Sequence, residues 1–462
     1  MADTSAQPAR FGTFTGVFTP TLLTILGVIM YVRIGWVVGN GGLLGAFLIM
    51  GVGLVITVCT GLSLSSIATN TRLGAGGPYA MVSRSLGLEV AGSVGIPLYL
   101  TRPLGIAMYI FGFREGIQWL AASWDMTVPA LLVDLVVFAG LFALAFISAD
   151  LAFTAQYLIL VVIAASLVSI FLGSPTTEPV SETVWVGEFG KLDGGTDFWG
   201  VFAVFFPATT GILAGANMSG ELKDSRKSIA YGTMAAIAVS TVIYFALAWW
   251  VSRAGTPEEL VGNYNVIIDN AWLPGLVFAG LLGATASSAL AGLVGGPRIL
   301  MAMARDRLVP ASDWLGQVTE SGEPRNAALV TGVLTLGCLM MRDLNAIAPL
   351  VTMFFLITYC IVNVIVLFEQ SLGLVSFRPS LRLPIWVPLI GTIGSIFAMF
   401  VVNPTVGMLA TAMVVGIYVW IDQTVEIAEN STAEARSSVF VALAEFAATR
   451  ANPDASNAAA VR

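Results

Sequence analysis

Long apolar segments, separated by short polar stretches, follow one another along almost the whole chain. A helix needs about 20 mainly apolar residues to cross a bilayer. The pattern predicts an all-α polytopic membrane protein with about 12 such helices. They are expected near residues 17–39, 43–66, 88–120, 127–148, 153–173, 199–220, 229–252, 271–303, 326–341, 344–370, 383–402 and 404–422.

The sixth apolar segment carries helix-breaking residues in its middle. In the stretch VFAVFFPATTGILAGANMSGEL (201–222), Pro207, Gly211 and Gly215 interrupt the helix beside the hydroxyls of Thr209 and Thr210. Irregular backbone at membrane depth is tolerated only where it lines a cavity or is buried in protein. The segment therefore predicts a broken helix that binds an ion or small solute.

A weak internal repeat relates the first and sixth helices. The triplet GVF at 16–18 is followed by Gly27, and the same triplet at 200–202 is followed by Gly211 after the same interval. Five spans precede the second copy, as in two inverted five-helix repeats whose interrupted helices meet at the midplane. The expected organisation is an N-terminal segment (1–16), a transporter domain (17–425) and a short tail (426–462). Within that domain lie repeat one (17–173), repeat two (199–370) and two further helices (383–425).

Composition excludes several other classes of protein. With 57% hydrophobic and 11% charged residues, a soluble globule of 462 residues is not expected. The net charge of −7 argues against a nucleic-acid partner, and the absence of histidine removes Ser-His and His-based metal chemistry from an intramembrane enzyme. Cys59, Cys338 and Cys360 lie in apolar runs, so they indicate core residues rather than disulfides or metal ligands. The expected partners are the lipid bilayer and small inorganic ions.

The distribution of charge predicts an orientation. With the N-terminus inside, most of the 21 Lys and Arg residues fall on the cytoplasmic side, as the positive-inside rule requires. Both termini are then cytoplasmic, the acidic loop 174–198 faces outward, and a plasma membrane (cell inner membrane) location is expected. Whether the protein forms a homodimer is left open by the sequence.

A break in a membrane helix can bind ions of both signs. The half before the break exposes carbonyls, which suit Na⁺ or K⁺, and the half after it exposes amides, which suit an anion. Amino-acid transporters of this architecture generally have a Gly-small-Gly stretch at the first break, and this chain has Leu26-Gly27-Val28. That bulk hinders a carboxylate and permits a compact halide.

Several stretches resemble the cation-chloride cotransporter family, within the amino acid–polyamine–organocation superfamily. The resemblance lies in LLTILGVIMYVRIGW (22–36), GGPYAMVSRSLGLEVAGSVG (76–95), GIAMYIFGFRE (105–115), FFPATTGILAGANMSGELKD (205–224), ATASSAL (284–290), GGPRILMAMARDRLVP (295–310) and FFLITY (354–359). It implies a secondary active symporter that couples Cl⁻ to Na⁺ and/or K⁺ by alternating access, with no cofactor besides the transported ions.

The resemblance also implies site residues, position by position. For potassium they are Thr24, Ile25, Tyr109, Pro207 and Thr210. For sodium they are Leu23, Leu26, Ala284, Ser287 and Ser288, and the serine pair is the form that the sodium-coupled branches of the family keep. For chloride they are the amides of Gly27, Val28 and Ile29 at one site, and those of Gly211, Ile212 and Leu213 with the Tyr359 hydroxyl at another.

One departure from the family concerns Arg102, which precedes Pro103 where the family usually has small or apolar residues. A charge at membrane depth is a functional candidate by default. Arg102 would attract anions into a vestibule, stand in for a bound cation, or pair with Glu89 or Asp134 as a structural element. The competing function is a proton- or sodium-coupled amino-acid or amine permease, in which Asp134 would carry the proton.

Overall fold

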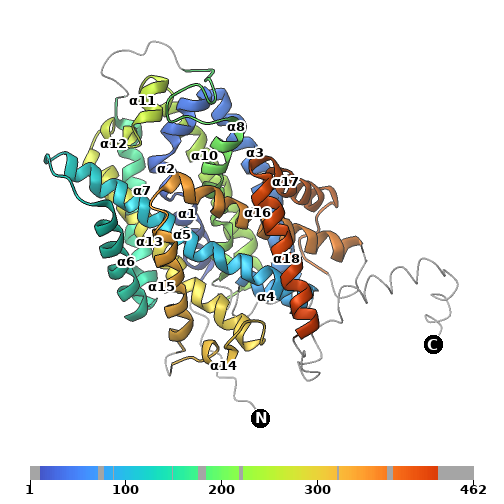
Figure 1. Ribbon diagram of the computed structural model, residues 1–462. Coiled ribbons are helices and arrows are strands. Elements are labelled where there is room, and N and C mark those ends of the chain that lie inside the picture. Colours follow the sequence, from blue (N-terminus) through green and yellow to red (C-terminus); the bar gives the residue numbers. More distant parts are fainter. Residues whose placement is uncertain are drawn as a thin grey trace, which may run out of the picture.

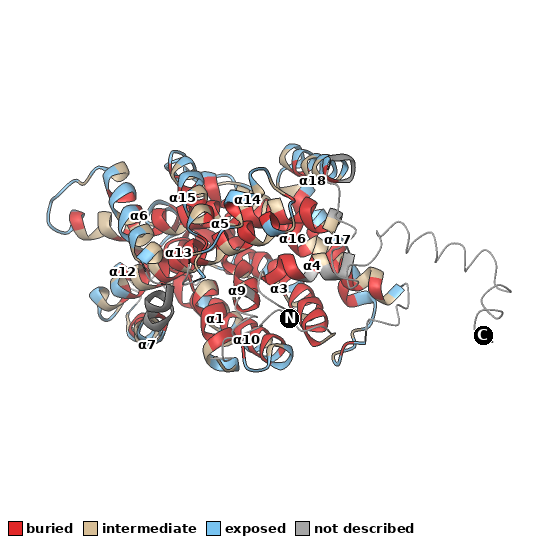
Figure 2. Cartoon of the chain, turned by 90° about the horizontal axis from the view of Figure 1, so that it is seen from below, coloured by how far each residue is buried: buried red, intermediate tan, exposed pale blue. Residues whose placement is uncertain are grey.

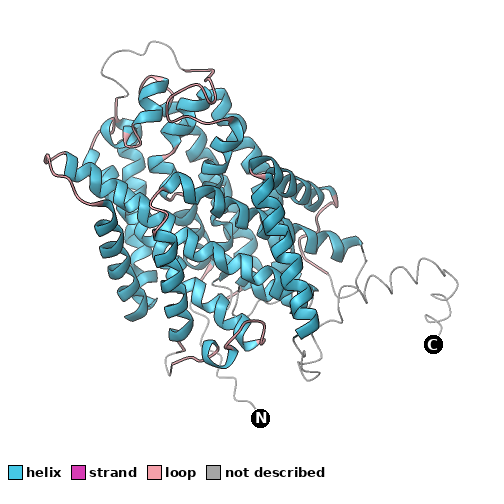
Figure 3. Ribbon diagram, viewed as in Figure 1, coloured by secondary structure: helices cyan, strands magenta, loops and turns pink. Residues whose placement is uncertain are grey.

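The computed structural model describes residues 11–70, 77–86, 88–147, 149–174, 184–217, 222–319, 322–371 and 378–424. Every regular element in these residues is helical (Figure 3). Most of the predicted N-terminal segment (1–16), part of the acidic loop and the whole of the predicted tail (426–462) lie outside the described residues.

The first half of the chain forms five membrane spans. Its elements are η1 (Phe14–Phe18), α1 (Thr19–Ile25), α2 (Val28–Val32), α3 (Ile34–Asn70), α4 (Gly77–Leu86), α5 (Leu88–Ala122), α6 (Ala130–Ile147) and α7 (Ala149–Leu172). The long α3 contains a sharp turn at Gly42 (φ 64°, ψ −176°), which separates the end of the first span from the second. A side chain at Gly42 would meet the Gly187 backbone nitrogen at 2.6 Å, so both the positive φ and the close approach require glycine.

The second half repeats this plan and adds two helices. Its elements are α8 (Phe198–Phe205), η2 (Phe206–Leu213), α9 (Ala214–Asn217), α10 (Ser225–Val251), α11 (Pro257–Gly262), α12 (Val266–Asp269), α13 (Pro274–Arg305), α14 (Ser312–Leu315), α15 (Arg325–Leu339), α16 (Leu344–Ser371), α17 (Trp386–Val402) and α18 (Pro404–Thr424). In Figure 1, α11 and α12 lie at one end of the bundle and α4 and α14 at the other. We call these ends the upper and lower sides.

The apolar helices overlap the segments in which membrane spans were predicted. Among the described residues, nine helical segments are long and apolar enough to cross a membrane, and three shorter apolar helices fall at 156–172, 325–339 and 386–402. Figure 2 shows buried residues in the interior of the bundle and exposed ones around its periphery. The peripheral side chains include large apolar residues, as a lipid-facing surface requires, among them Leu48, Val136, Val161, Val242, Val333 and Leu409.

The interrupted first and sixth helices lie next to each other inside the bundle. The segment α1 contacts η2, while α5, α13 and α16 surround the pair. This is the arrangement of two inverted repeats whose broken helices meet in the interior.

Candidate ion-binding site

The first helix breaks where the sequence predicts. Helix α1 ends at Ile25, Leu26 has φ −78° and ψ 46°, and Gly27 has φ −93° and ψ −149° before α2 begins at Val28. The last carbonyls of α1 and the first amides of α2 therefore have no partners within their own helices. Both kinds of group are available to ions at this point.

The interruption of the sixth helix is a tighter helix and not unwound chain. Residues Phe206–Leu213 form the 3₁₀ helix η2, and the Thr210 hydroxyl donates to the Pro207 carbonyl at 2.7 Å. A 3₁₀ helix uses its amides in i→i+3 bonds. The amides of Gly211, Ile212 and Leu213 are consequently less available to an anion in this conformation than those that follow Gly27.

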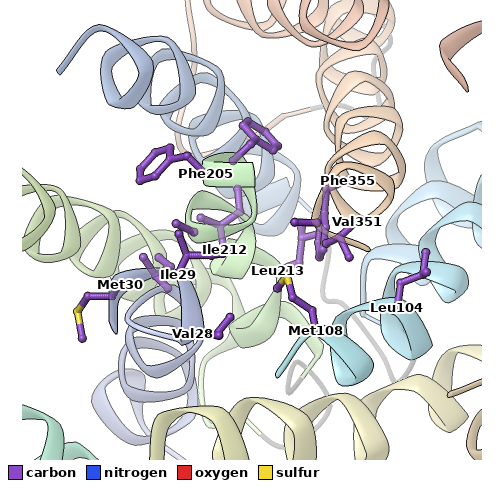
Figure 4. Packing of buried hydrophobic residues seen from close by; sticks show 14 of the residues in the cluster. Val28, Ile29, Met30, Leu104, Met108, Phe205, Ile212, Leu213, Val351 and Phe355 are labelled. Atoms are coloured by element: carbon purple, nitrogen blue, oxygen red, sulfur yellow. The ribbon is translucent and has the colours of Figure 1, made fainter. Parts of the chain in front are cut away.

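Two glycines bring the helices of the site together. A methyl group on Gly211 would lie 2.8 Å from the Ile25 nitrogen, so the η2 backbone lies directly against the end of α1. A methyl group on Gly27 would lie 3.6 Å from Tyr109 Cε1 and 3.8 Å from Ser288 Oγ. Figure 4 shows apolar residues of α2, η2, α5 and α16 around this junction. The break thus faces α5 and α13 at Tyr109 and Ser288.

A cavity of about 60 Å³, measured for the centres of water-sized molecules, opens beside the break. It is lined by Thr24, Tyr109, Thr210 and Ser288, and by Arg102. The lining continues to Gly77, the first residue of α4, and to Arg298 near the lower end of α13. The cavity therefore runs from the middle of the bundle toward the lower side, where the Tyr79 hydroxyl donates to a carboxylate oxygen of Asp306. Burial raises the pKa of the Asp306 carboxyl.

The residues predicted for sodium lie around the same break. Ser287 and Ser288 are buried on α13, and the Ser288 hydroxyl has no hydrogen-bond partner. An unsatisfied buried hydroxyl is costly, so it is a ready ligand for a cation. The remaining sodium candidates are likewise buried: Leu23, Leu26 and Ala284.

Two tyrosines bond the backbone at the candidate site. The Tyr244 hydroxyl on α10 donates to the carbonyl of Ile25 at 2.8 Å, and the Tyr359 hydroxyl on α16 donates to the carbonyl of Thr209 at 3.0 Å. Ile25 therefore keeps one carbonyl lone pair for a cation, and Tyr359 has to exchange its partner to donate to chloride. Sequence reasoning missed Tyr244, because a tyrosine in an apolar helix carries no local signal of its distant partner.

The structure tests the partners considered for Arg102. Asp134 pairs instead with Arg114, whose Nη1 lies 2.7 Å from Asp134 Oδ2, so the interpretation of Asp134 as the structural partner of Arg102 is wrong. Asp134 also does not line the cavity. The side chain of Glu89 lies outside the described residues.

On the upper side, a buried ion pair joins the first interrupted helix to α5 and α16. Arg33, between α2 and α3, makes two bonds of 2.8 and 2.9 Å to the carboxylate of Glu115 on α5. Its Nε donates to Asn345 at the start of α16 (2.7 Å), and its guanidinium lies 3.8 Å above the centre of the Tyr264 ring. These residues were not predicted as functional, although charges inside the apolar stretches MYVRIGW and IFGFREG were a signal. The cavity therefore extends toward the lower side, and this ion pair lies on the upper side of the break.

Comparison with known proteins fits this architecture. A family model described as amino acid permease matches residues 16–450. The chain belongs to the amino acid permease family. Its relatives include solute carrier family 12 member 2 of mouse (29% identical, 89% of this chain and 39% of the relative) and member 1 of human (28%, 91% and 43%). Member 3 of mouse is similar too (28%, 90% and 47%), so the chain spans less than half the length of these curated relatives.

These relatives confirm the resemblance to cation-chloride cotransporters, and they are transporters rather than enzymes. A solved structure of a Na⁺-coupled sialic acid symporter, in its substrate-bound outward-open state, has a TM-score of 0.53 at 13% identity and covers 86% of this chain and 90% of that one. This likeness confirms the polytopic all-α fold with inverted repeats and interrupted helices.

Proposed function

We propose that this secondary transporter is a symporter that couples Cl⁻ to Na⁺ and/or K⁺ by alternating access. The observation that carries the proposal is the cavity beside Gly27, where helix-end carbonyls and amides meet the free hydroxyl of Ser288. Cations would use the carbonyls and hydroxyls, and chloride the first amides of α2. The lower side, rich in arginine, would face the cytoplasm of a plasma membrane.

The decisive experiment is flux in proteoliposomes that contain the purified protein. Radioactive chloride uptake is expected to be driven by an inward Na⁺ gradient, whereas a panel of labelled amino acids is not expected to accumulate. Uptake of an amino acid that needs no chloride would contradict the proposal.

That contrary result would support the second candidate, an amino-acid or amine permease. The observation in its favour is Arg102, since a guanidinium can bind a carboxylate with two parallel hydrogen bonds. The bulk of Leu26 and Val28 beside the helix-end amides argues against it.

A prediction concerns the second chloride site and Tyr359. In Tyr359→Phe the anion loses one donor, but it no longer has to displace the bond to Thr209. A hydrogen bond to a charge contributes about 1.5–3 kcal/mol and a neutral one about 0.5–1.5, so the net loss is about 1–1.5 kcal/mol. The half-saturating chloride concentration is expected to rise about five- to tenfold.

The matched control is Tyr99→Phe, because the Tyr99 hydroxyl is also buried but bonds Thr331 at 3.0 Å, outside the cavity lining. It should leave chloride dependence unchanged. If both variants behave like the wild type, Tyr359 does not contact a transported chloride.

A further inference from the structure

Arg102 lies in the same cavity as three of the residues predicted for potassium. The cavity lining includes Arg102, Thr24, Tyr109 and Thr210. A permanent positive charge therefore occupies the neighbourhood in which a potassium ion would bind.

The surrounding helices make room for this side chain. Gly296 on α13 faces it, and a methyl group placed on Gly296 would lie 3.1 Å from Arg102 Cβ and 3.4 Å from Arg102 Cγ. The stem of the arginine, which belongs to α5, thus packs against α13, and the residue lines the cavity. The packing of α13 therefore accommodates Arg102 inside the bundle, and the side chain does not extend to the membrane surface.

The guanidinium of Arg102 has no partner of opposite charge among the described residues. Within the part of the chain that the structure describes, no carboxylate forms an ion pair with Arg102, and its Nε and Nη2 atoms are buried without hydrogen-bond partners. By contrast, Arg33, just before α3, and Arg114 on α5 each pair with a carboxylate. A buried charge is costly unless it is paired, so Arg102 requires an anion from solution.

We infer that Arg102 replaces the potassium ion as a fixed cation: it offsets the charge of bound chloride, and the protein carries Na⁺ and Cl⁻ without K⁺. This inference rests on the proposed function. Two positive charges in one small cavity repel each other, and mobile ions do not screen them there as they do in water. A bound K⁺ and the guanidinium would compete for the same chloride. Unlike K⁺, the guanidinium is part of the protein and cannot leave the site.

The test measures ion coupling in proteoliposomes of the full chain. Wild-type protein should take up chloride under a Na⁺ gradient equally well when K⁺ is replaced by choline, and it should take up no radioactive rubidium above empty liposomes. Arg102→Gln removes the charge and leaves a polar side chain, an amide, in place of the guanidinium. Its half-saturating chloride concentration should rise about tenfold or more, as expected for a lost charged hydrogen bond, and K⁺ should partly restore it.

The matched control is Arg298→Gln, which removes a charge from the lower end of the same cavity, where Arg298 already lies 3.8 Å from Glu323. It should create no response to K⁺. Chloride-dependent rubidium uptake by the wild type would overturn the inference and leave the proposed function standing. Absence of chloride uptake driven by either Na⁺ or K⁺ in the wild type would overturn the proposed function, and the inference with it. The chloride and rubidium measurements on the wild type test both proposals even if Arg102→Gln does not fold.

Discussion

Replacing both Ser287 and Ser288 with alanine is expected to abolish the stimulation of chloride uptake by Na⁺. The two hydroxyls are the side-chain ligands of the proposed sodium site, whose other ligands are backbone carbonyls. The Ser288 hydroxyl is buried without a partner when no ion is bound, so its removal relieves a cost of about 1–3 kcal/mol in the empty protein. The double variant should therefore fold, and its Tm should no longer rise when Na⁺ is added.

Thr285→Val is the matched control for the serine pair. Thr285 is buried on the same helix, but its hydroxyl donates to the Leu281 carbonyl at 2.7 Å and the residue does not line the cavity. This variant should keep the Na⁺ response. A serine-pair variant with unchanged Na⁺ dependence would show that the sodium assignment is wrong.

The spans of the fold could be predicted because membrane helices are fixed by length and apolarity. The segment predicted at 88–120 is α5 (Leu88–Ala122), and that predicted at 271–303 is α13 (Pro274–Arg305). The break at Gly27 was also predictable, since a glycine matched by position to Gly211 indicated the two interrupted helices. Each of these features is visible in a local stretch of the sequence.

Two of the three features that were not predicted depend on residues that lie in different helices. Sequence alone indicated an unwound stretch around Pro207, whereas threonine hydroxyls that bond the preceding carbonyls accompany a compact 3₁₀ helix there. The pairing of Asp134 with Arg114, rather than with Arg102, follows from the positions of α5 and α6 in space. Burial of Arg33 against Glu115 and Tyr264 likewise joins three separate segments.

The residues proposed for cations and those proposed for the second chloride differ in how the structure arranges them. Ser288, Thr24, Tyr109 and Thr210 line one cavity, so their joint role in cation binding has a geometric basis. The chloride site at Gly211, Ile212 and Leu213 requires that η2 loosen or that Tyr359 exchange its partner. The resemblance indicated both sets of residues in the same way. Only the three-dimensional arrangement shows that the second set needs a rearrangement before it can bind an ion.

Glu115→Gln is expected to shift the protein toward conformations open on the upper side. When the upper side is closed, the variant leaves the Arg33 guanidinium, whose side chain is 1% exposed, without a counter-ion. When the upper side opens, water can reach the guanidinium. Removing one partner of a buried ion pair costs about 3–5 kcal/mol, and relief of even half of this on opening changes the ratio of the two states by about tenfold or more. The shift can be measured with a cysteine at Ala291, which lines the cavity, in a protein whose three native cysteines are replaced.

A membrane-impermeant thiol reagent applied from the lower side should label Ala291→Cys readily in the otherwise unchanged protein and more slowly, by a factor of up to about ten, with Glu115→Gln, because the open state below is less populated. Asp134→Asn is the matched control: it breaks the neighbouring buried pair with Arg114, which joins α5 to α6 without involving the interrupted helix. That variant should be less stable, but its folded fraction should be labelled at the same rate as the parent protein. Equal labelling of Glu115→Gln and the parent protein would mean that the Arg33–Glu115 pair stabilises both conformations alike. The upper side would then be held closed mainly by apolar contacts between α2, α5 and α16.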